Sequence, residues 1–434
     1  MAKRPKFIEI RTYQVGFGDC FLLSFVYGEK DKRHVLIDFG TTGLPGKTAK
    51  PSLHMPKIAN HIKGVCDPDG LTAVVATHRH ADHINGFGTD GRTGKSGTII
   101  ANLKPRVVLQ PWTEDPDAKR DARAATRDSS RSRKSVVAGL AAMNDVARMV
   151  ADIAMKPPSW MSASLQKELM FLGQDNIANK SAVENLIAMG SRKGATAVWA
   201  HHGSKSGLER LLPGVKVHVL GPPDLKQSEK IRKMRSRDPD QFWHLVSGGA
   251  GKNLLATGVA WGAKAQSRRV PPGARWFRDR LEKLNGQQLL EIVRTLDQQM
   301  NNTSLILLFD VFGKKLLFPG DAQIENWSYA FDDAPDAEKT RALLEEVDVY
   351  KVGHHGSLNA TPKKGLWERF RKRDNGLLTL LSTMPGKHGN SRSKTEVPRT
   401  TLLKELEERS TLQNTVTLKM GDTTAPCHFV KVEP

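Results

Sequence analysis

The sequence predicts an α/β protein, on two observations made along its 434 residues. Short runs rich in Val, Ile, Leu and Phe, bounded by Gly, Asp or Pro, predict strands in most parts of the chain. Other segments carry apolar residues three to four positions apart, which predicts amphipathic helices. Strands that alternate with helices throughout a chain are typical of the α/β class.

The N-terminal part is predicted to be mainly strands. Gly16, Gly18 and Asp19 separate the first two runs, which favours a hairpin. The run at 71–77 is continuously apolar and rich in β-branched residues, as expected of a strand buried on both faces, and it leads directly into the segment THRHADH. Residues 41–63 are polar at first and then helical. The strands are predicted at residues 7–15, 20–28, 34–40, 71–77 and 106–112.

Two basic segments are predicted to be insertions. Residues 115–190 are Ala-rich and helical, and residues 225–299 combine a Gly-rich stretch with a further helix. The remaining elements lie between and after these insertions. We expect strands at 195–200 and 215–223, a hairpin at 303–321 that turns at Gly313, strands at 347–353, 377–383 and 415–420, and a helix at 400–409.

Charge and composition limit the partners of the chain. Its 66 basic and 46 acidic side chains give 66 − 46 = +20, which favours polyanions such as nucleic acid, unless the source has basic proteins in general. Three cysteines are too few for a disulfide framework. No apolar run approaches the roughly 18–20 residues that cross a bilayer, and no apolar stretch follows the basic start. We therefore expect a cytoplasmic protein without a membrane partner.

The strongest chemical signal is the segment Thr77–His83. It places three imidazoles and a carboxylate directly after a buried strand, at His78, His80, Asp82 and His83. Imidazole and carboxylate are the usual protein ligands of zinc and similar divalent ions. Ligands at i and i+2 can share one ion on extended backbone, and a following helix can direct the next two at a second ion. The alternative is a His-rich surface loop.

Together with three later motifs, this segment resembles the signature of the metallo-β-lactamase fold superfamily. LIDFG contains Asp38, LFPGDA contains Asp321, and KVGHHGS contains His354 and His355. With VGFGDC and NNTSLIL, the set most resembles the hydrolase domain of the competence DNA-uptake protein ComEC and its soluble stand-alone relatives. The resemblance implies one domain over residues 1–434, an αββα sandwich of two mixed sheets flanked by helices, with residues 300–434 as its second half.

The resemblance also implies roles for individual residues. Two divalent ions, Zn²⁺ or Mn²⁺, would be held by His78 and His80 at the first position and by Asp82 and His83 at the second. Asp321 would bridge them. One of His354 and His355 would be a further ligand, and the other would lie near a bound phosphate or leaving group. The implied catalytic residues are Asp82, Asp321, His354 and His355.

Three positions are left open by the resemblance. A third histidine of the first site is expected at His202, with His201 and His218 as alternatives. Relatives carry a His-Pro pair late in the domain where this chain has Val397 and Pro398, and His388 is the candidate substitute. Asp19 is expected to shape a turn that supports the site.

The expected function is a dinuclear metal-dependent hydrolase. We expect a phosphodiesterase or nuclease that cleaves DNA or RNA by metal-activated hydroxide, in DNA processing or in defence against foreign DNA. The alternatives are hydrolysis of a small molecule (a cyclic nucleotide, phosphocholine ester, lactone or lactam) and a metal-stabilised scaffold without activity.

The basic insertions are the expected nucleic-acid contacts. Residues 118–134 contain seven Lys or Arg against two Asp, and residues 230–237 contain five more basic side chains. Such runs contact phosphates, although a solvated face or a protein-binding surface is the alternative. The residues expected to bind nucleic acid are Arg131, Arg133, Lys134, Arg232, Lys233 and Arg235. The oligomeric state is left open.

Overall fold

The computed structural model describes residues 3–46, 49–115, 155–157, 161–163, 166, 169, 179–224, 226–228, 300–357, 360–389, 396–419 and 426–434. Most of the two predicted insertions lies outside these residues. The same holds for the six basic residues expected to bind nucleic acid, Arg131, Arg133, Lys134, Arg232, Lys233 and Arg235.

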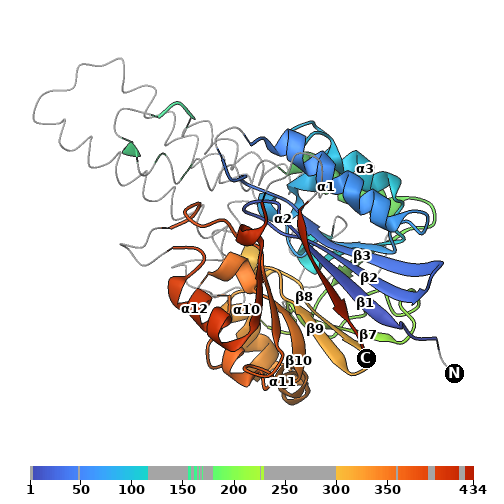
Figure 1. Ribbon diagram of the computed structural model, residues 1–434, viewed down its shortest axis with the longest axis vertical. Coiled ribbons are helices and arrows are strands. Elements are labelled where there is room, and N and C mark those ends of the chain that lie inside the picture. The colour runs from blue at the N-terminus through green and yellow to red at the C-terminus, as the bar shows by residue number, and fades with distance from the viewer. Residues whose placement is uncertain are drawn as a thin grey trace, which may run out of the picture.

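Two mixed sheets form the centre of the described structure (Figure 1). The first has the strand order β13-β1-β2-β3-β4-β5-β6 and the second has the order β12-β11-β10-β9-β8-β7. The first sheet contains β1 (Phe7–Tyr13), β2 (Cys20–Gly28), β3 (Asp31–Phe39), β4 (Ala73–Val75), β5 (Val107–Pro111), β6 (Thr196–Ala200) and β13 (Cys427–Val432). The second contains β7 (Val215–Gly221), β8 (Ile306–Val311), β9 (Lys314–Phe318), β10 (Val347–Lys351), β11 (Leu378–Leu381) and β12 (Thr411–Asn414).

Each sheet is antiparallel on one side and parallel on the other. In the first, β13, β1, β2 and β3 pair antiparallel, whereas β3 to β6 pair parallel. In the second, β7, β8 and β9 pair antiparallel, whereas β9 to β12 pair parallel. The predicted α/β class is therefore confirmed, and so is the predicted hairpin, which β8 and β9 form around Gly313.

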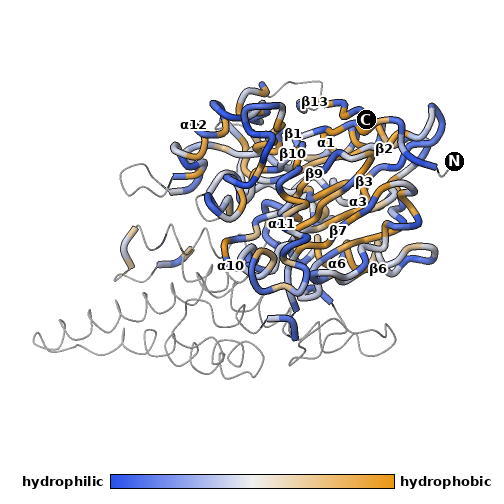
Figure 2. Tube along the Cα trace, turned by 90° about the horizontal axis from the view of Figure 1, so that it is seen from below, coloured by the Kyte–Doolittle hydropathy of each residue, from blue (hydrophilic) through white to orange (hydrophobic). Residues whose placement is uncertain are grey.

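The main hydrophobic core lies between the two sheets. On β1, burial alternates along the strand so that Ile8 and Ile10 face this core, as the period of a strand requires. The ring centroids of Phe21 and Phe318 are 5.7 Å apart across the core. Figure 2 shows hydrophobic residues concentrated in the strands. The two sheets thus pack face to face through their apolar side chains.

Helices cover the outer faces of both sheets (Figure 1). A second core lies between the first sheet and its helices, and a third lies between the second sheet and its own. The first group comprises α1 (Pro51–Cys66), α3 (Ser96–Asn102) and α6 (Lys180–Ser191), and the second comprises α10 (Ile324–Ser328), α11 (Ala337–Glu345) and α12 (Thr400–Arg409). This layering is consistent with a sandwich. Within the described residues, none of the helices combines the length and apolarity needed to cross a bilayer.

The C-terminal region differs from the prediction. A strand was expected at 415–420, but β12 lies earlier and a 3-10 turn at Thr415–Thr417 follows it. The Asn414 side chain accepts a hydrogen bond from the Val416 amide at 3.1 Å, which turns the chain away from the sheet. The last strand, β13, was not predicted, because its alternating CHFVKV sequence is short and only partly buried. β13 returns the chain to the first sheet, where it pairs with β1, although the strands from β7 to β12 all belong to the second sheet.

The polar segments lie where the strands of both sheets end. Asp38 is near the end of β3, Thr77 follows β4, Asp321 follows β9 and the segment Gly353–Gly356 follows β10. Because β3 and β4 are parallel, as are β9 and β10, their carboxyl ends share an edge of each sheet. Asp19 precedes β2, which is antiparallel to β3 and therefore begins at that same edge. The topology thus brings these segments together.

Candidate metal centre

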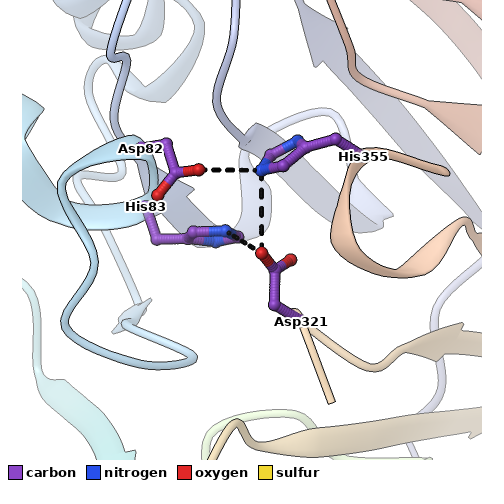
Figure 3. Close-up of side chains that lie close together, drawn as sticks. All are labelled: Asp82, His83, Asp321 and His355. Carbon is purple, nitrogen blue, oxygen red and sulfur yellow. Dashed lines mark hydrogen bonds and ion pairs between the residues drawn. The ribbon is translucent and has the colours of Figure 1, made fainter. Parts of the chain in front are cut away.

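Four buried side chains converge at the shared edge (Figure 3). Each offers one ligand atom, and these atoms all lie within 4.8 Å of one another. Asp82 Oδ2 is 3.0 Å from His355 Nε2, His83 Nε2 is 3.0 Å from Asp321 Oδ2, and His355 Nε2 is 3.7 Å from Asp321 Oδ2. The four are Asp82 and His83 in α2 (Ala81–Ile84), Asp321 after β9, and His355 after β10.

The spacing and chemistry of this group suit a divalent ion. Two ligands about 2.1 Å from one tetrahedral ion lie about 3.4 Å apart, which is close to the separations observed. Although His83 Nε2 and Asp321 Oδ2 are close, they do not align as a hydrogen bond, and both atoms are buried without another hydrogen-bond partner. Buried polar atoms in that state need an explanation, and a shared ion provides one.

Asp38 orients the His83 ring from behind. Its Oδ2 accepts a hydrogen bond from His83 Nδ1 at 2.8 Å. The same carboxylate is fixed by the Thr77 amide and hydroxyl, each at 2.7 Å. When Nδ1–H of a neutral imidazole donates a hydrogen bond to a carboxylate, the lone pair lies on Nε2. His83 therefore presents Nε2 to Asp321, and Asp38 supports its ring.

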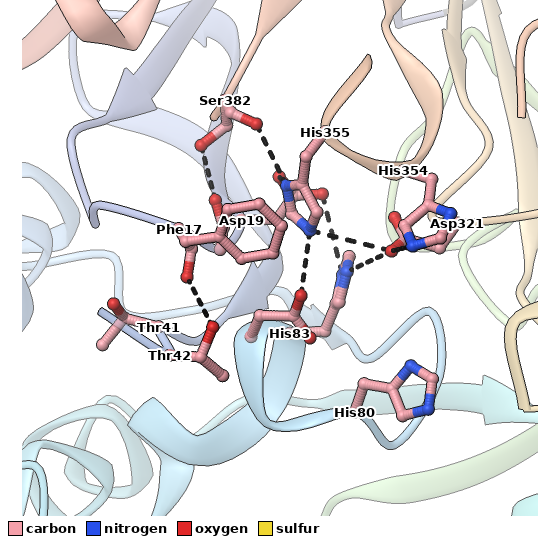
Figure 4. Close-up of polar contacts among 12 residues, drawn as sticks. Phe17, Asp19, Thr41, Thr42, His80, His83, Asp321, His354, His355 and Ser382 are labelled. Carbon is pink, nitrogen blue, oxygen red and sulfur yellow. Dashed lines mark hydrogen bonds and ion pairs between the residues drawn. The ribbon is translucent and has the colours of Figure 1, made fainter. Parts of the chain in front are cut away.

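The His355 ring is held in the same way (Figure 4). Its Nδ1 lies 3.0 Å from the carbonyl oxygen of Ser382, which accepts a hydrogen bond from it. Asp19 Oδ1 is 3.5 Å from that nitrogen, and Asp19 Oδ2 is 3.6 Å from His83 Nδ1. Asp19 therefore lies behind both ligand histidines. Of the two candidates at 354 and 355, it is His355 that joins the four-residue group.

The group is strongly coupled electrostatically. Burial alone would lower the pKa of His83, but Asp321 and Asp38 outweigh it and hold that pKa well above its usual range. Burial would raise the pKa of Asp321, but the neighbouring cations, led by His83, keep it well below the ordinary value. The carboxylates are therefore ionised, and a proton on His83 balances them until a cation replaces it.

Lys351 is a buried cation at the site that the sequence analysis did not single out. Its ammonium lies 2.5 Å from Asp19 Oδ2 and 3.4 Å from Asp321 Oδ1, and its side chain is 2% exposed. Burial would lower the pKa of Lys351, but Asp19 and Asp321 raise it above its ordinary value. The available signal was a single lysine in the otherwise apolar end of β10, YKVG.

His78 and His80 lie beside the group. His78 Nε2 and His80 Nδ1 are 3.0 Å apart, and the His78 ring packs on His83 with centroids 4.1 Å apart. Burial lowers the pKa of His80 to about 4, so its imidazole is neutral. In the described part of the chain, neither histidine belongs to a group of three or more mutually close ligand residues.

The backbone is left-handed at both residues of the His-His pair. His354 has φ 45° and ψ 52°, and His355 has φ 52° and ψ 23°. Each such residue costs roughly 1–2 kcal/mol for a side chain other than glycine. This turn directs His355 into the group, whereas the His354 side chain is 27% exposed with Nε2 3.7 Å from Asp321 Oδ2. Of the His354–His355 pair, His354 is thus the histidine that is partly exposed to solvent.

Glycines allow the ligand turn to approach the first sheet closely. A Cβ at Gly40 would lie 2.5 Å from Ala81 O and from His83 N. A Cβ at Gly18 would lie 2.6 Å from Asp82 O. The Asp19 amide also donates a hydrogen bond to Asp82 O at 2.8 Å. The start of α2 is therefore clamped against the loops before β2 and after β3.

The expected third histidine is placed elsewhere. His202 Nε2 is 2.6 Å from Asp336 Oδ1, and its Nδ1 is 2.8 Å from Leu220 O. Both ring nitrogens are thus engaged, which gives no support to a metal role for His202. His201 Nδ1 contacts the His202 carbonyl, and His218 on β7 lies among Lys339, Asp310 and other charged residues.

His388 lies near the His355 ring. The Phe17 ring packs between His388 and His355, with centroid separations of 4.2 and 4.3 Å. His388 and Val397 form a β-bridge. Burial lowers the pKa of His388 to about 3.

The chain matches no protein-family model, and no curated protein matches its sequence. The four-residue group and its supporting contacts are therefore the basis for assigning a function.

Proposed function

We propose that the protein is a metal-dependent phosphodiesterase of the metallo-β-lactamase type that cleaves DNA or RNA. The observation that carries the proposal is the convergence of Asp82, His83, Asp321 and His355, two from each half of the chain, on one buried point. Burying this many ionisable groups is unfavourable unless they are compensated, so a fold that gathers them needs a function for them.

We assign one divalent ion to these four residues and a second to His78 and His80, with Asp321 next to both. When bound, such ions supply Lewis-acid chemistry, which activates water for attack and offsets the negative charge of a phosphodiester. Zn²⁺ and Mn²⁺ both suit imidazole and carboxylate ligands. Because His202 is engaged elsewhere, the ion at His78 and His80 would keep open coordination positions for substrate.

His354 is the residue that we assign as the general acid, which would protonate the leaving group. Its side chain is partly exposed (27%), and its Nδ1 is 3.0 Å from the Ser357 hydroxyl, which fixes the ring. Burial lowers its pKa, so a proton placed on Nε2 is readily given up. Asp38 and Asp19 keep the ligand rings aligned, and the phenyl ring of Phe17 excludes water beside His355.

A polynucleotide substrate is supported by the charge of the chain. The net charge of +20 favours long polyanions, whereas a small ester or lactam needs no such excess. Binding to a polynucleotide should weaken steeply with salt, because counterions are released when phosphates are neutralised. A small-molecule substrate should show almost no such slope.

The decisive experiment is a cleavage assay with labelled single- and double-stranded DNA and RNA in the presence of Mn²⁺ or Zn²⁺. We expect cleavage by the full-length protein and a fall of more than about 100-fold in Asp321→Asn, since even the outer partners of metal ligands are worth 10- to 100-fold. Asp90→Asn, an acidic residue with an exposed partner, should cleave normally.

Other outcomes separate the alternatives. Metal binding without cleavage of any polynucleotide would favour the small-molecule hydrolase, to be tested with phosphodiester, lactone and lactam substrates. Equal rates for Asp321→Asn and the unsubstituted protein would contradict the proposed centre.

A further inference from the structure

Three acceptors surround the buried ammonium of Lys351. They are Asp19 Oδ2 at 2.5 Å, the Gly320 carbonyl oxygen at 2.9 Å and Asp321 Oδ1 at 3.4 Å. The ammonium donates hydrogen bonds to the last two and forms an ion pair with Asp19. Both carboxylates are at most 1% exposed, and the lysine is 2% exposed. This is an enclosed ion pair rather than a surface contact.

The two oxygens of Asp321 have different partners. Oδ1 faces Lys351, while Oδ2 lies 3.0 Å from His83 Nε2 and 3.7 Å from both His354 Nε2 and His355 Nε2. Lys351 therefore contacts one oxygen of Asp321, and the imidazoles lie on the side of the other.

The same ammonium lies among acidic groups that resemble a second cation site. Asp19, Asp38 and His83 have ligand atoms within 4.8 Å of one another. Because Lys351 is in contact with Asp19, its positive charge takes the place of the cation that these carboxylates would otherwise attract. A fixed ammonium there leaves the four-residue group as the place for a divalent ion.

We propose that Lys351 is the positioning residue of the metal centre: it holds Asp321 so that only Oδ2 faces the ions, and it serves as a built-in cation on the Asp19 side. This inference rests on the proposed metal centre. It names a residue that touches neither ion nor substrate and acts through Asp321 and Asp19.

Charge and position predict opposite effects, which makes the inference testable. Removing a positive charge beside a cation site should tighten divalent binding by Coulomb's law alone. Releasing Asp321 Oδ1 should instead weaken binding, by about 10- to 100-fold if Lys351 resembles other supporting partners of metal ligands. The sign of the change therefore separates a positioning role from a purely electrostatic one.

The experiment compares Asp19→Asn with the double variant Asp19→Asn/Lys351→Met. The single substitution keeps the lysine on Asp321, and the double one removes it without leaving Asp19 charged and unpaired in the interior. Zn²⁺ affinity is measured by competition with a chromophoric chelator on full-length, metal-stripped protein, and Co²⁺ absorption reports the ligand geometry. Urea unfolding in chelator checks that both variants fold.

We expect the double variant to bind Zn²⁺ about 10- to 100-fold more weakly than Asp19→Asn, with a changed Co²⁺ spectrum. The matched control is Lys372→Met/Asp348→Asn, which removes a 2.8 Å ion pair at β10 and should change neither readout. Equal or tighter Zn²⁺ binding in the double variant would overturn the inference alone. An unsubstituted protein that binds neither ion would overturn the metal centre and the inference together.

Discussion

Replacing Asp38 by Asn tests how the ligand histidines are held. Asp38 Oδ1 accepts from the Thr77 amide, a backbone donor that cannot rotate, so an asparagine must keep its oxygen there. Its NH₂ group then takes the place of Oδ2 and faces His83 Nδ1. Two donors cannot pair, so His83 must move its proton to Nε2, the atom that faces Asp321.

The magnitude follows from these contacts. Loss of the correct tautomer should weaken metal binding by about 10- to 100-fold, or roughly 1.4–2.7 kcal/mol. Folding should change less. The variant keeps the contact with the Thr77 amide and loses about one hydrogen bond, worth about 1 kcal/mol. It also removes a buried charge, which burial disfavours, as the raised pKa of Asp38 indicates.

The assay is Zn²⁺ affinity by chelator competition, together with urea unfolding in the absence of metal. Asp31→Asn is the matched control, since Asp31 lies at the other end of β3 and pairs with Lys3 and Arg33 near the surface. We expect full affinity in the control and a selective loss in Asp38→Asn. Unchanged affinity in Asp38→Asn would refute the tautomer argument.

Three further predictions concern stability. Burial lowers the pKa of His34 to about 4, so between pH 6.5 and 4 only the unfolded chain takes up its proton, and the stabilisation present above pH 6.5 is lost as the pH falls. Between pH 7.5 and pH 5, the free energy of unfolding in urea should therefore fall by about 2 kcal/mol more for the unsubstituted protein than for His34→Gln. Equal falls in the two proteins would contradict this. Gly40→Ala should destabilise the protein by about 1–3 kcal/mol in thermal unfolding, because its Cβ would overpack against α2. Gly64→Ala, in α1 with open space at its Cβ, should instead stabilise it by up to about 1 kcal/mol. A change of the same sign in both variants would refute the clash. His354→Gly removes about 1–2 kcal/mol of left-handed strain and a hydrogen bond worth about 1 kcal/mol, so its unfolding free energy should stay within about 1 kcal/mol of the unsubstituted protein while cleavage falls, and a larger loss of stability would argue against strain.

Much of the fold could be predicted because its signals are local. Continuous apolar runs identified β2 and β5, and helical periodicity placed α12 at 400–409 as observed. That the segment after β4 and the aspartate after β9 would meet was expected only from the resemblance of their motifs to a known family. The last strand could not be found, because an exposed edge strand has little apolar pattern.

The supporting contacts could not be predicted, since they join residues far apart in the sequence. Nothing near Lys351 indicates that its partner is Asp19, and nothing near His202 indicates that Asp336 occupies its ring. The choice of His355 over His354 depends on two left-handed residues, which sequence periodicity does not report. Such pairings are set by tertiary structure, and only ligand type is visible in the sequence.

The origin of the four ligands has a consequence for the mechanics of the fold. Asp82 and His83 follow a strand of the first sheet, and Asp321 and His355 follow strands of the second. An ion shared among them would act as a non-covalent cross-link between the two sheets. It would close a loop of the chain that runs from residue 83 to residue 321. The sheets could then separate only after releasing it, so resistance to heat would rise with ion concentration as mass action requires.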